Sequence, residues 1–115
     1  QYNDPPHPVT YPIEWHGIIK AGLHNAMSNS SIIITEVGPS NEWDTAELDR
    51  YYHELYTLVA NGSIEEFFVY APHSGCVSPS AYPWCPHALR RHLYATPTGD
   101  GFTKSGQALI NARPN

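Results

Sequence analysis

Apolar residues recur at helical spacing in two stretches of the chain. The first stretch predicts an amphipathic helix over about residues 13–28, with an apolar stripe made of Trp15, Ile19, Leu23, Ala26 and Met27. The second predicts a helix over about residues 45–60, with an apolar face made of Leu48, Tyr52, Leu55 and Val59. Asp44 and Glu47 have the spacing of an N-terminal capping box. The Asn-Gly pair at 61–62 favours a left-handed helix end, so both limits of the second helix are predicted.

Two short apolar runs have the character of β-strands. Residues 31–37 contain three consecutive β-branched aliphatic residues, Ile32 to Ile34, and residues 64–70 contain the run Phe-Phe-Val. Runs that are apolar on both faces are typical of parallel strands covered by helices on either side. A strand, a four-turn helix and a second strand form a βαβ unit. The predicted fold class is therefore α/β with parallel strands.

The remaining chain is rich in proline and loops. Residues 1–12 hold four prolines and predict an extended arm, which precedes a single α/β region over residues 13–115. Further helices are expected near residues 86–93 and 103–112. Isolated two-stranded sheets are marginally stable in water, so additional strands are needed. They are either hidden in the loops, as in a small α+β secreted domain, or supplied by another polypeptide.

Composition and charge narrow the class of protein. The chain has 115 residues, 41% of them hydrophobic, and a formal net charge of -5, which fits one small globular domain. Its six basic residues form no stripe that could follow a phosphate backbone, so no nucleic-acid partner is expected. No apolar stretch approaches the roughly 20 residues of a membrane-spanning helix, so no membrane association is expected.

Several features of the sequence favour a secreted protein. It contains eleven prolines, two cysteines, and N-x-S/T sequons at Asn29 and Asn61. Cys76 and Cys85 flank a rigid, proline-containing segment, and a local disulfide between them is expected. Both sequon asparagines are expected to lie on the surface and to carry glycans in a eukaryotic source. The sequence opens at Gln1 without a leader, which we expect to have been removed.

Histidines and cysteines cluster after the second predicted strand, but their spacing does not suit a metal site. Zinc ligands usually pair as C-x2-4-C and H-x3-5-H. Cys76 and Cys85 are nine residues apart, and only His87 and His92 have a suitable spacing. The sequence also contains no glycine-rich loop of the kind that cradles phosphates. We therefore expect neither a metal nor a cofactor.

Glu36 is the strongest candidate for a catalytic residue. It lies at the end of the isoleucine-rich strand, which Gly38 and Pro39 then stop. Ligand sites in parallel α/β proteins form at the carboxyl ends of strands, so this carboxylate can act as nucleophile or general base. His73 follows the second strand and is expected at the same end. The alternative is that Glu36 pairs with an arginine or a helix N-terminus without any catalytic role.

Aromatic residues in the loops are candidates for ligand contacts. Flat rings can stack against sugars or be buried by a protein partner. Trp43 lies in the loop directly after Glu36, where a ligand-contacting role is favoured. Tyr82 and Trp84 both lie between the two cysteines, where a role in the local packing of the proline-rich loop is favoured. Trp84 is nevertheless retained as a candidate substrate-binding residue.

The order of these motifs resembles the last third of a clan A glycoside hydrolase (β/α)8 barrel. The matching phrases are IIITEVG around Glu36, EFFVYAP around Tyr70, and TGDGFTKSGQALI near the end of the chain. The resemblance covers about residues 13–112 and implies that they hold strands seven and eight. It implies that Glu36 is the nucleophile of a retaining enzyme. Trp43, Tyr70 and His73 would then position the sugar.

The chain is too short to form the whole of such a barrel. A complete barrel takes roughly 250 residues, and the resemblance places the acid/base glutamate on strand four, which lies outside the matching part. Retaining cleavage needs two carboxylates about 5 to 5.5 Å apart. We therefore expect carbohydrate as the ligand, a second chain that supplies the rest of the barrel, and no hydrolysis by this chain alone.

Two other functions remain open at the level of the sequence. The first is a small secreted module that binds glycan or protein through its aromatic loops, without catalysis. The second is a structural subunit in which Glu36 is an ion-pair partner. The native mass and the number of chains in the assembly distinguish the fragment of a barrel from the small binding module.

Overall fold

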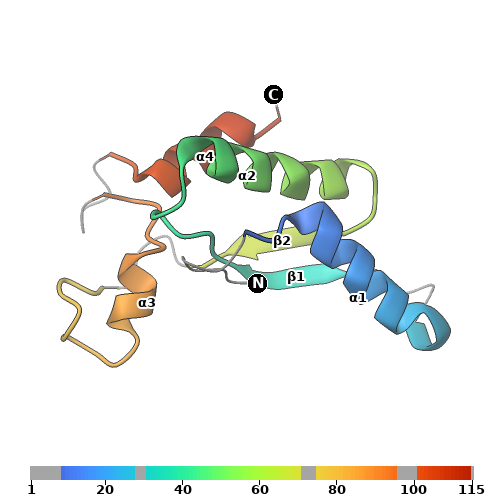
Figure 1. The fold of residues 1–115 in the computed structure, drawn as a ribbon, viewed down its shortest axis with the longest axis horizontal. Helices are drawn as coiled ribbons and strands as arrows, with labels where there is room; N and C mark the ends of the chain where they lie inside the picture. The colour runs from blue at the N-terminus through green and yellow to red at the C-terminus, as the bar shows by residue number, and fades with distance from the viewer. Residues whose placement is uncertain (1–8, 28–30, 71–74, 96–100, 115) are drawn as a thin grey trace.

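The computed structural model describes residues 9–27, 31–70, 75–95 and 101–114. Its elements follow one another as α1 (Pro12–Met27), β1 (Ile33–Val37), α2 (Thr45–Ala60), β2 (Glu66–Val69), α3 (Cys85–Leu89) and α4 (Lys104–Ala112). The two strands run parallel, and α2 connects them (Figure 1). The predicted α/β class with a βαβ unit is confirmed.

The limits of α2 follow from its local sequence. Asp44 Oδ1 accepts a hydrogen bond from the Glu47 N–H (2.8 Å), and Glu47 Oε1 accepts one from the Asp44 N–H (3.2 Å). These two bonds satisfy N–H groups that have no partner within the helix. At the other end Gly62 adopts a φ of 78°, a left-handed conformation that costs glycine little. The predicted limits of this helix are confirmed at both ends.

The core lies between the helices and one face of the sheet. α2 packs against both α1 and α4, and α2 and α4 lie along the same side of the strands (Figure 1). The Tyr52 hydroxyl and Ser105 Oγ form a buried hydrogen bond of 2.7 Å between α2 and α4. The buried cluster consists of Trp15, Val37, Trp43, Leu48, Tyr51, Tyr52, Leu55 and Ala108.

The other face of the sheet is uncovered by the described chain. Ile34, Phe67 and Val69 pack against the core cluster. In contrast, Ile33 and Phe68 are 46% and 52% exposed. The described part of the chain therefore covers the isoleucine strand on one face, which the packed helices contact, and a cover for the second face stays a prediction. Two strands are also all that the described residues contribute to the sheet.

The first predicted helix is confirmed over Pro12–Met27, but its apolar stripe is only partly used. Trp15 is buried in the core cluster, whereas Ile19, the next residue of the stripe, is exposed. Beyond these residues, the second half of α1 extends past the strands (Figure 1). Within the described residues, no helix is both long and apolar enough to cross a membrane.

Candidate functional site

Glu36 lies at the carboxyl end of β1, where the strand contains a bulge. Ile34 pairs with Phe67 and Val37 pairs with Val69, so β1 advances three residues while β2 advances two. Strict alternation would turn Glu36 toward the same face as Ile34. The additional residue instead places Val37 in the core and leaves Glu36 exposed. Bulges commonly redirect a side chain beside a functional site.

The loop that follows Glu36 is held by a fully buried arginine. Arg91 has no exposed surface, and its Nε donates a 2.7 Å hydrogen bond to the Gly38 carbonyl. Its Nη1 also donates to the His87 carbonyl (3.1 Å), which ties the arginine to α3. Hydrogen bonds from a charged donor are stronger than those between neutral groups. The backbone two residues beyond Glu36 is therefore fixed to the segment that follows α3.

Asn41 joins the same loop to two other parts of the chain. Its backbone N–H donates to the Arg90 carbonyl (2.8 Å), and its Nδ2 donates to the His92 carbonyl (3.0 Å). Its Oδ1 accepts from the Ser105 N–H in the first turn of α4 (2.8 Å). One side chain thus satisfies a helix N–H and fixes the position of the loop relative to α4.

Trp43 lies inside the core and not on the surface. Its side chain is 2% exposed and meets the Tyr51 ring edge to face, with ring centroids 5.5 Å apart. Its backbone carbonyl accepts a 2.7 Å hydrogen bond from Lys104 Nζ. An indole with so little exposed surface presents no face on which a sugar can stack. The structure therefore gives Trp43 a packing role that the sequence did not favour.

Tyr70 lies at the same end of the sheet as Glu36. Its backbone N–H donates a 2.7 Å hydrogen bond to the carbonyl of Val37, the residue after Glu36. The half-buried Tyr70 ring lies 5.6 Å from the His87 ring, measured between centroids. The expected juxtaposition of Glu36 and Tyr70 is thus seen in the backbone. His73, the other residue expected there, lies outside the described residues.

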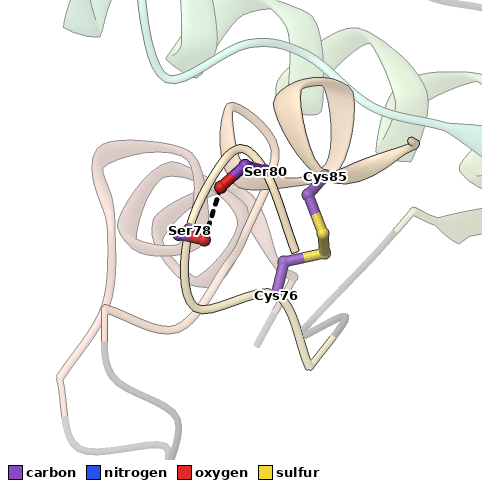
Figure 2. Close-up of a disulfide and its surroundings, with 4 residues drawn as sticks. All are labelled: Cys76, Ser78, Ser80 and Cys85. Carbon is purple, nitrogen blue, oxygen red and sulfur yellow. Dashed lines mark hydrogen bonds between the residues drawn. A yellow bond between two sulfur atoms is a disulfide. The ribbon is translucent and has the colours of Figure 1, made fainter. Parts of the chain in front are cut away.

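The predicted disulfide between Cys76 and Cys85 is confirmed (Figure 2). Both cysteines are buried, and Ala88 of α3 packs beside them. The bond closes a short loop after β2, and such a closure contributes about 2 to 3 kcal/mol by restricting the unfolded chain. Ser78 and Ser80 form a hydrogen bond inside this loop (3.4 Å).

Tyr82 and Trp84 form an exposed aromatic pair on the disulfide loop. Their rings are stacked, with centroids 4.8 Å apart and planes 4° from parallel. Each side chain is about half exposed (51% and 52%). Each ring contacts its neighbour with one face, so the opposite faces are the ones a ligand could meet. The structure groups Trp84 with the disulfide, on a different loop from the one after Glu36.

Of the two sequon asparagines, the structure describes Asn61. Asn61 is exposed at the C-terminal end of α2, and its Oδ1 accepts a hydrogen bond from the Ser63 N–H (2.9 Å). Asn29 lies outside the described residues. Among the residues that the structure describes, no group of three His, Cys, Asp or Glu side chains could hold a metal ion.

Sequence reasoning missed the two residues that hold the loop after Glu36. Arg91 reaches Gly38 across 53 positions, and Asn41 reaches Ser105 across 64. Neighbouring residues in the sequence indicate neither contact, because each contact joins segments that are far apart in the chain. The one available hint was an Arg-Arg pair in a chain with only six basic residues.

Comparisons with known proteins add no family to this description. No protein-family model matches the chain, no curated protein matches its sequence, and no solved structure matches its fold.

Proposed function

We propose that this chain is the nucleophile-bearing part of a secreted, retaining glycoside hydrolase. The observation that carries the proposal is the position of Glu36. A strand bulge presents this carboxylate at the exposed carboxyl end of a parallel strand, and the loop after it is held by Arg91 and Asn41. Ligand sites in parallel α/β proteins form at this end of the strands.

The arrangement of the helices supports a barrel origin. Contacts run from α1 to α2 and from α2 to α4, and the core cluster lies between these helices and one face of the strands. Consecutive β/α units of a (β/α)8 barrel have this arrangement, with helices outside and the other sheet face toward the barrel interior. The exposed Ile33 and Phe68 lie on the face that would become the interior.

The proposed reaction is a double displacement. A Glu36 carboxylate oxygen attacks the anomeric carbon, while a carboxylic acid on the completing polypeptide protonates the departing glycosidic oxygen. The resulting glycosyl ester is then hydrolysed by water, which transfers a proton to that second carboxylate. This second step breaks the ester bond and regenerates the Glu36 carboxylate. Tyr70, beside the strand end, and His73 are proposed to position the sugar.

Covalent trapping tests the role of Glu36 in the native assembly. The chain, purified with its completing polypeptide, is treated with 2-deoxy-2-fluoroglycosyl fluorides of the common hexoses and pentoses. Such sugars slow the breakdown of the glycosyl-enzyme intermediate, so a labelled peptide containing Glu36 is expected. Glu36→Gln should abolish the label and reduce turnover by orders of magnitude while ligand binding largely survives, because the amide keeps the shape but cannot attack.

Glu65→Gln is the matched control for this experiment. Glu65 is exposed and lies before β2, at the opposite end of the strand from the proposed site. It should label and turn over like the unmodified protein. Label on another carboxylate, or full activity of Glu36→Gln, would refute the assignment of the nucleophile.

A second candidate function is a secreted glycan- or protein-binding module without catalysis. The stacked pair of Tyr82 and Trp84 favours it, because two half-exposed rings on a disulfide-closed loop form a rigid apolar surface. A monodisperse 12.8 kDa species with cooperative thermal unfolding would replace the hydrolase proposal with this one. Trp84→Ala should then abolish binding on a glycan array, whereas Glu36→Gln should leave it unchanged.

The proposed secretion rests on the disulfide and on one sequon. Disulfides persist mainly in oxidising compartments, and the Cys76–Cys85 bond is part of the fold. Asn61 is exposed, as a glycan attachment site requires. Digestion with an endoglycosidase, followed by intact-mass measurement, tests whether Asn61 and Asn29 carry glycans.

A further inference from the structure

The stacked rings of Tyr82 and Trp84, here called the aromatic pair, are held in place by their own backbone. The Tyr82 carbonyl accepts a hydrogen bond from the Cys85 N–H (3.1 Å), and the Trp84 carbonyl accepts one from within α3 (3.0 Å). Pro83 lies between the two residues and has a fixed φ. The disulfide from Cys76 to Cys85 closes the loop around them. The half-exposed pair is therefore preorganised for a ligand.

The aromatic pair lies on the side of the sheet where Glu36 ends its strand. Tyr70, whose N–H is bound to the Val37 carbonyl beside Glu36, also packs against the buried cluster that contains the disulfide. Trp84 lies directly before α3. In Figure 1, α3 and the loop before it lie beyond the ends to which both strands point, and the loop projects outward from them. The surface at the strand ends thus continues to the aromatic pair.

Two ring contacts mark the path from the strand end to the aromatic pair. The Tyr70 ring lies next to the strand end, and its centroid is 5.6 Å from that of the His87 ring on α3. Trp84 precedes His87 by three residues, which corresponds to roughly 5 Å along a helix axis. A ligand that follows this path crosses several ring-sized intervals. A chain of sugars has that length, whereas a single sugar does not.

The loop that carries the aromatic pair has no charge of its own. Residues 75–86 contain no acidic residue, no basic residue and no histidine, although 15% of the chain is charged. The polar side-chain groups of this loop are hydroxyls and one indole N–H, from Ser78, Ser80, Tyr82 and Trp84. An anionic sugar would find no cation here to pair with. A neutral sugar can place its C–H groups on a ring face and its hydroxyls against these polar groups.

We infer that the aromatic pair is a distal subsite for a neutral polysaccharide, another unit of which reaches Glu36. The inference rests on the proposed function and specifies its substrate as a polymer of uncharged sugars. One sugar unit stacks on the outer face of Tyr82 or Trp84. Binding at this distance from the reacting bond holds the chain beside Glu36 and so raises the effective concentration of the unit to be cleaved.

Affinity electrophoresis of the native assembly tests this subsite. The chain is purified with its completing polypeptide and carries Glu36→Gln, so that the polymer is not cut during the run. Separate native gels contain a neutral glucan, xylan or galactomannan, and a further gel contains polygalacturonate as the anionic probe. We expect at least one neutral polymer to retard the assembly and polygalacturonate to leave its migration unchanged.

Variants of the loop locate the bound polymer. Replacing both rings, by Tyr82→Ala with Trp84→Ala, should raise the dissociation constant for the retarding polymer roughly tenfold. Tyr82→Phe with Trp84→Phe keeps two flat rings and should retain most of the affinity. Val77→Ala is the matched control, because Val77 is 78% exposed on the same loop but has no ring. It should bind the polymer like the assembly that carries Glu36→Gln alone.

Kinetics with Glu36 intact give a second measurement. The two substrates are the retarding polymer and an aryl glycoside of its single sugar, which is too short to reach the aromatic pair. The ratio of kcat/KM for the polymer to kcat/KM for the aryl glycoside should fall roughly tenfold when both rings are replaced by alanine.

Three results would overturn the inference. The first is that no neutral polymer retards the assembly, or that the double alanine variant, with unchanged thermal unfolding, is retarded equally. The second is stronger retardation by polygalacturonate than by the neutral polymers. The third is loss of the completing polypeptide from the double alanine variant on gel filtration, since the aromatic pair would then contact protein. Trapping of Glu36 uses one small sugar, so it can succeed when this test fails. Retardation without a label on Glu36 would instead leave the subsite and refute the proposed nucleophile.

Discussion

Gly106 is the position where one added methyl group should do the most damage. It lies in the first turn of α4, where the helix meets the segment after α3. A Cβ at this position would lie 2.0 Å from the Leu93 carbonyl oxygen and 2.9 Å from its carbonyl carbon. The Thr103 N–H already donates a hydrogen bond to that oxygen (3.0 Å), and this bond holds the Leu93 carbonyl against the first turn of α4.

The expected cost follows from two opposing contributions. Alanine favours a helix over glycine by about 1 kcal/mol. Against this, the Leu93 backbone would have to move by roughly 1 Å or more, with loss of its hydrogen bond to Thr103 and of part of the α2–α4 packing. We expect Gly106→Ala to lower the free energy of unfolding by about 3 kcal/mol in total.

Urea unfolding followed by circular dichroism measures this difference. Gly22→Ala is the matched control, because Gly22 is also helical and an added Cβ would meet nothing within 4 Å. It should raise the free energy of unfolding by about 0.5 to 1 kcal/mol. Equal stability of the two alanine variants would refute the close packing of α4 against Leu93.

Two further predictions concern buried polar groups. Asn41→Ala should lower the free energy of unfolding by about 2 to 4 kcal/mol in urea, because it removes two side-chain hydrogen bonds and leaves the Ser105 N–H without its acceptor; a loss below about 1 kcal/mol would contradict this role. Burial raises the pKa of Tyr52 well above its usual value, although its hydrogen bond with Ser105 acts in the opposite direction. The unfolded chain releases the Tyr52 proton near pH 10, whereas the folded chain keeps it. The contribution of Tyr52 to the free energy of unfolding is therefore complete below about pH 10, and it falls by about 1.4 kcal/mol per pH unit above that. Urea titrations from about pH 8 to 11 should therefore show a less steep loss of stability for Tyr52→Phe than for the unmodified chain.

The sequence predicted those elements whose limits are determined by neighbouring residues in the chain. The capping box at Asp44 and the glycine at 62 are recognised from neighbouring residues, and both limits of α2 agree with the structure. The disulfide was predictable because its cysteines are close in sequence and flank a constrained segment. Each of these features depends on a few consecutive residues, which a single sequence fully contains.

The features that the sequence did not predict depend on tertiary contacts. The bulge in β1 appears only when the pairing with β2 is known, because one residue between Ile34 and Val37 has no counterpart. Trp43 looked like a loop residue available to ligands, yet α2 and α4 bury it. For the same reason, the burial of Arg91 could not be read from its neighbours.

The hydrogen bonds around Asn41 also bear on the order of events during folding. They join residues that are 51 and 64 positions apart, whereas the disulfide joins cysteines nine positions apart. Closing a long loop costs more chain entropy, so contacts of high sequence separation slow folding and tend to form after local ones. We therefore expect the loop beside Glu36 to be among the last parts to reach its native geometry. A newly made chain would hold its helices and its disulfide before the proposed nucleophile acquires its final surroundings.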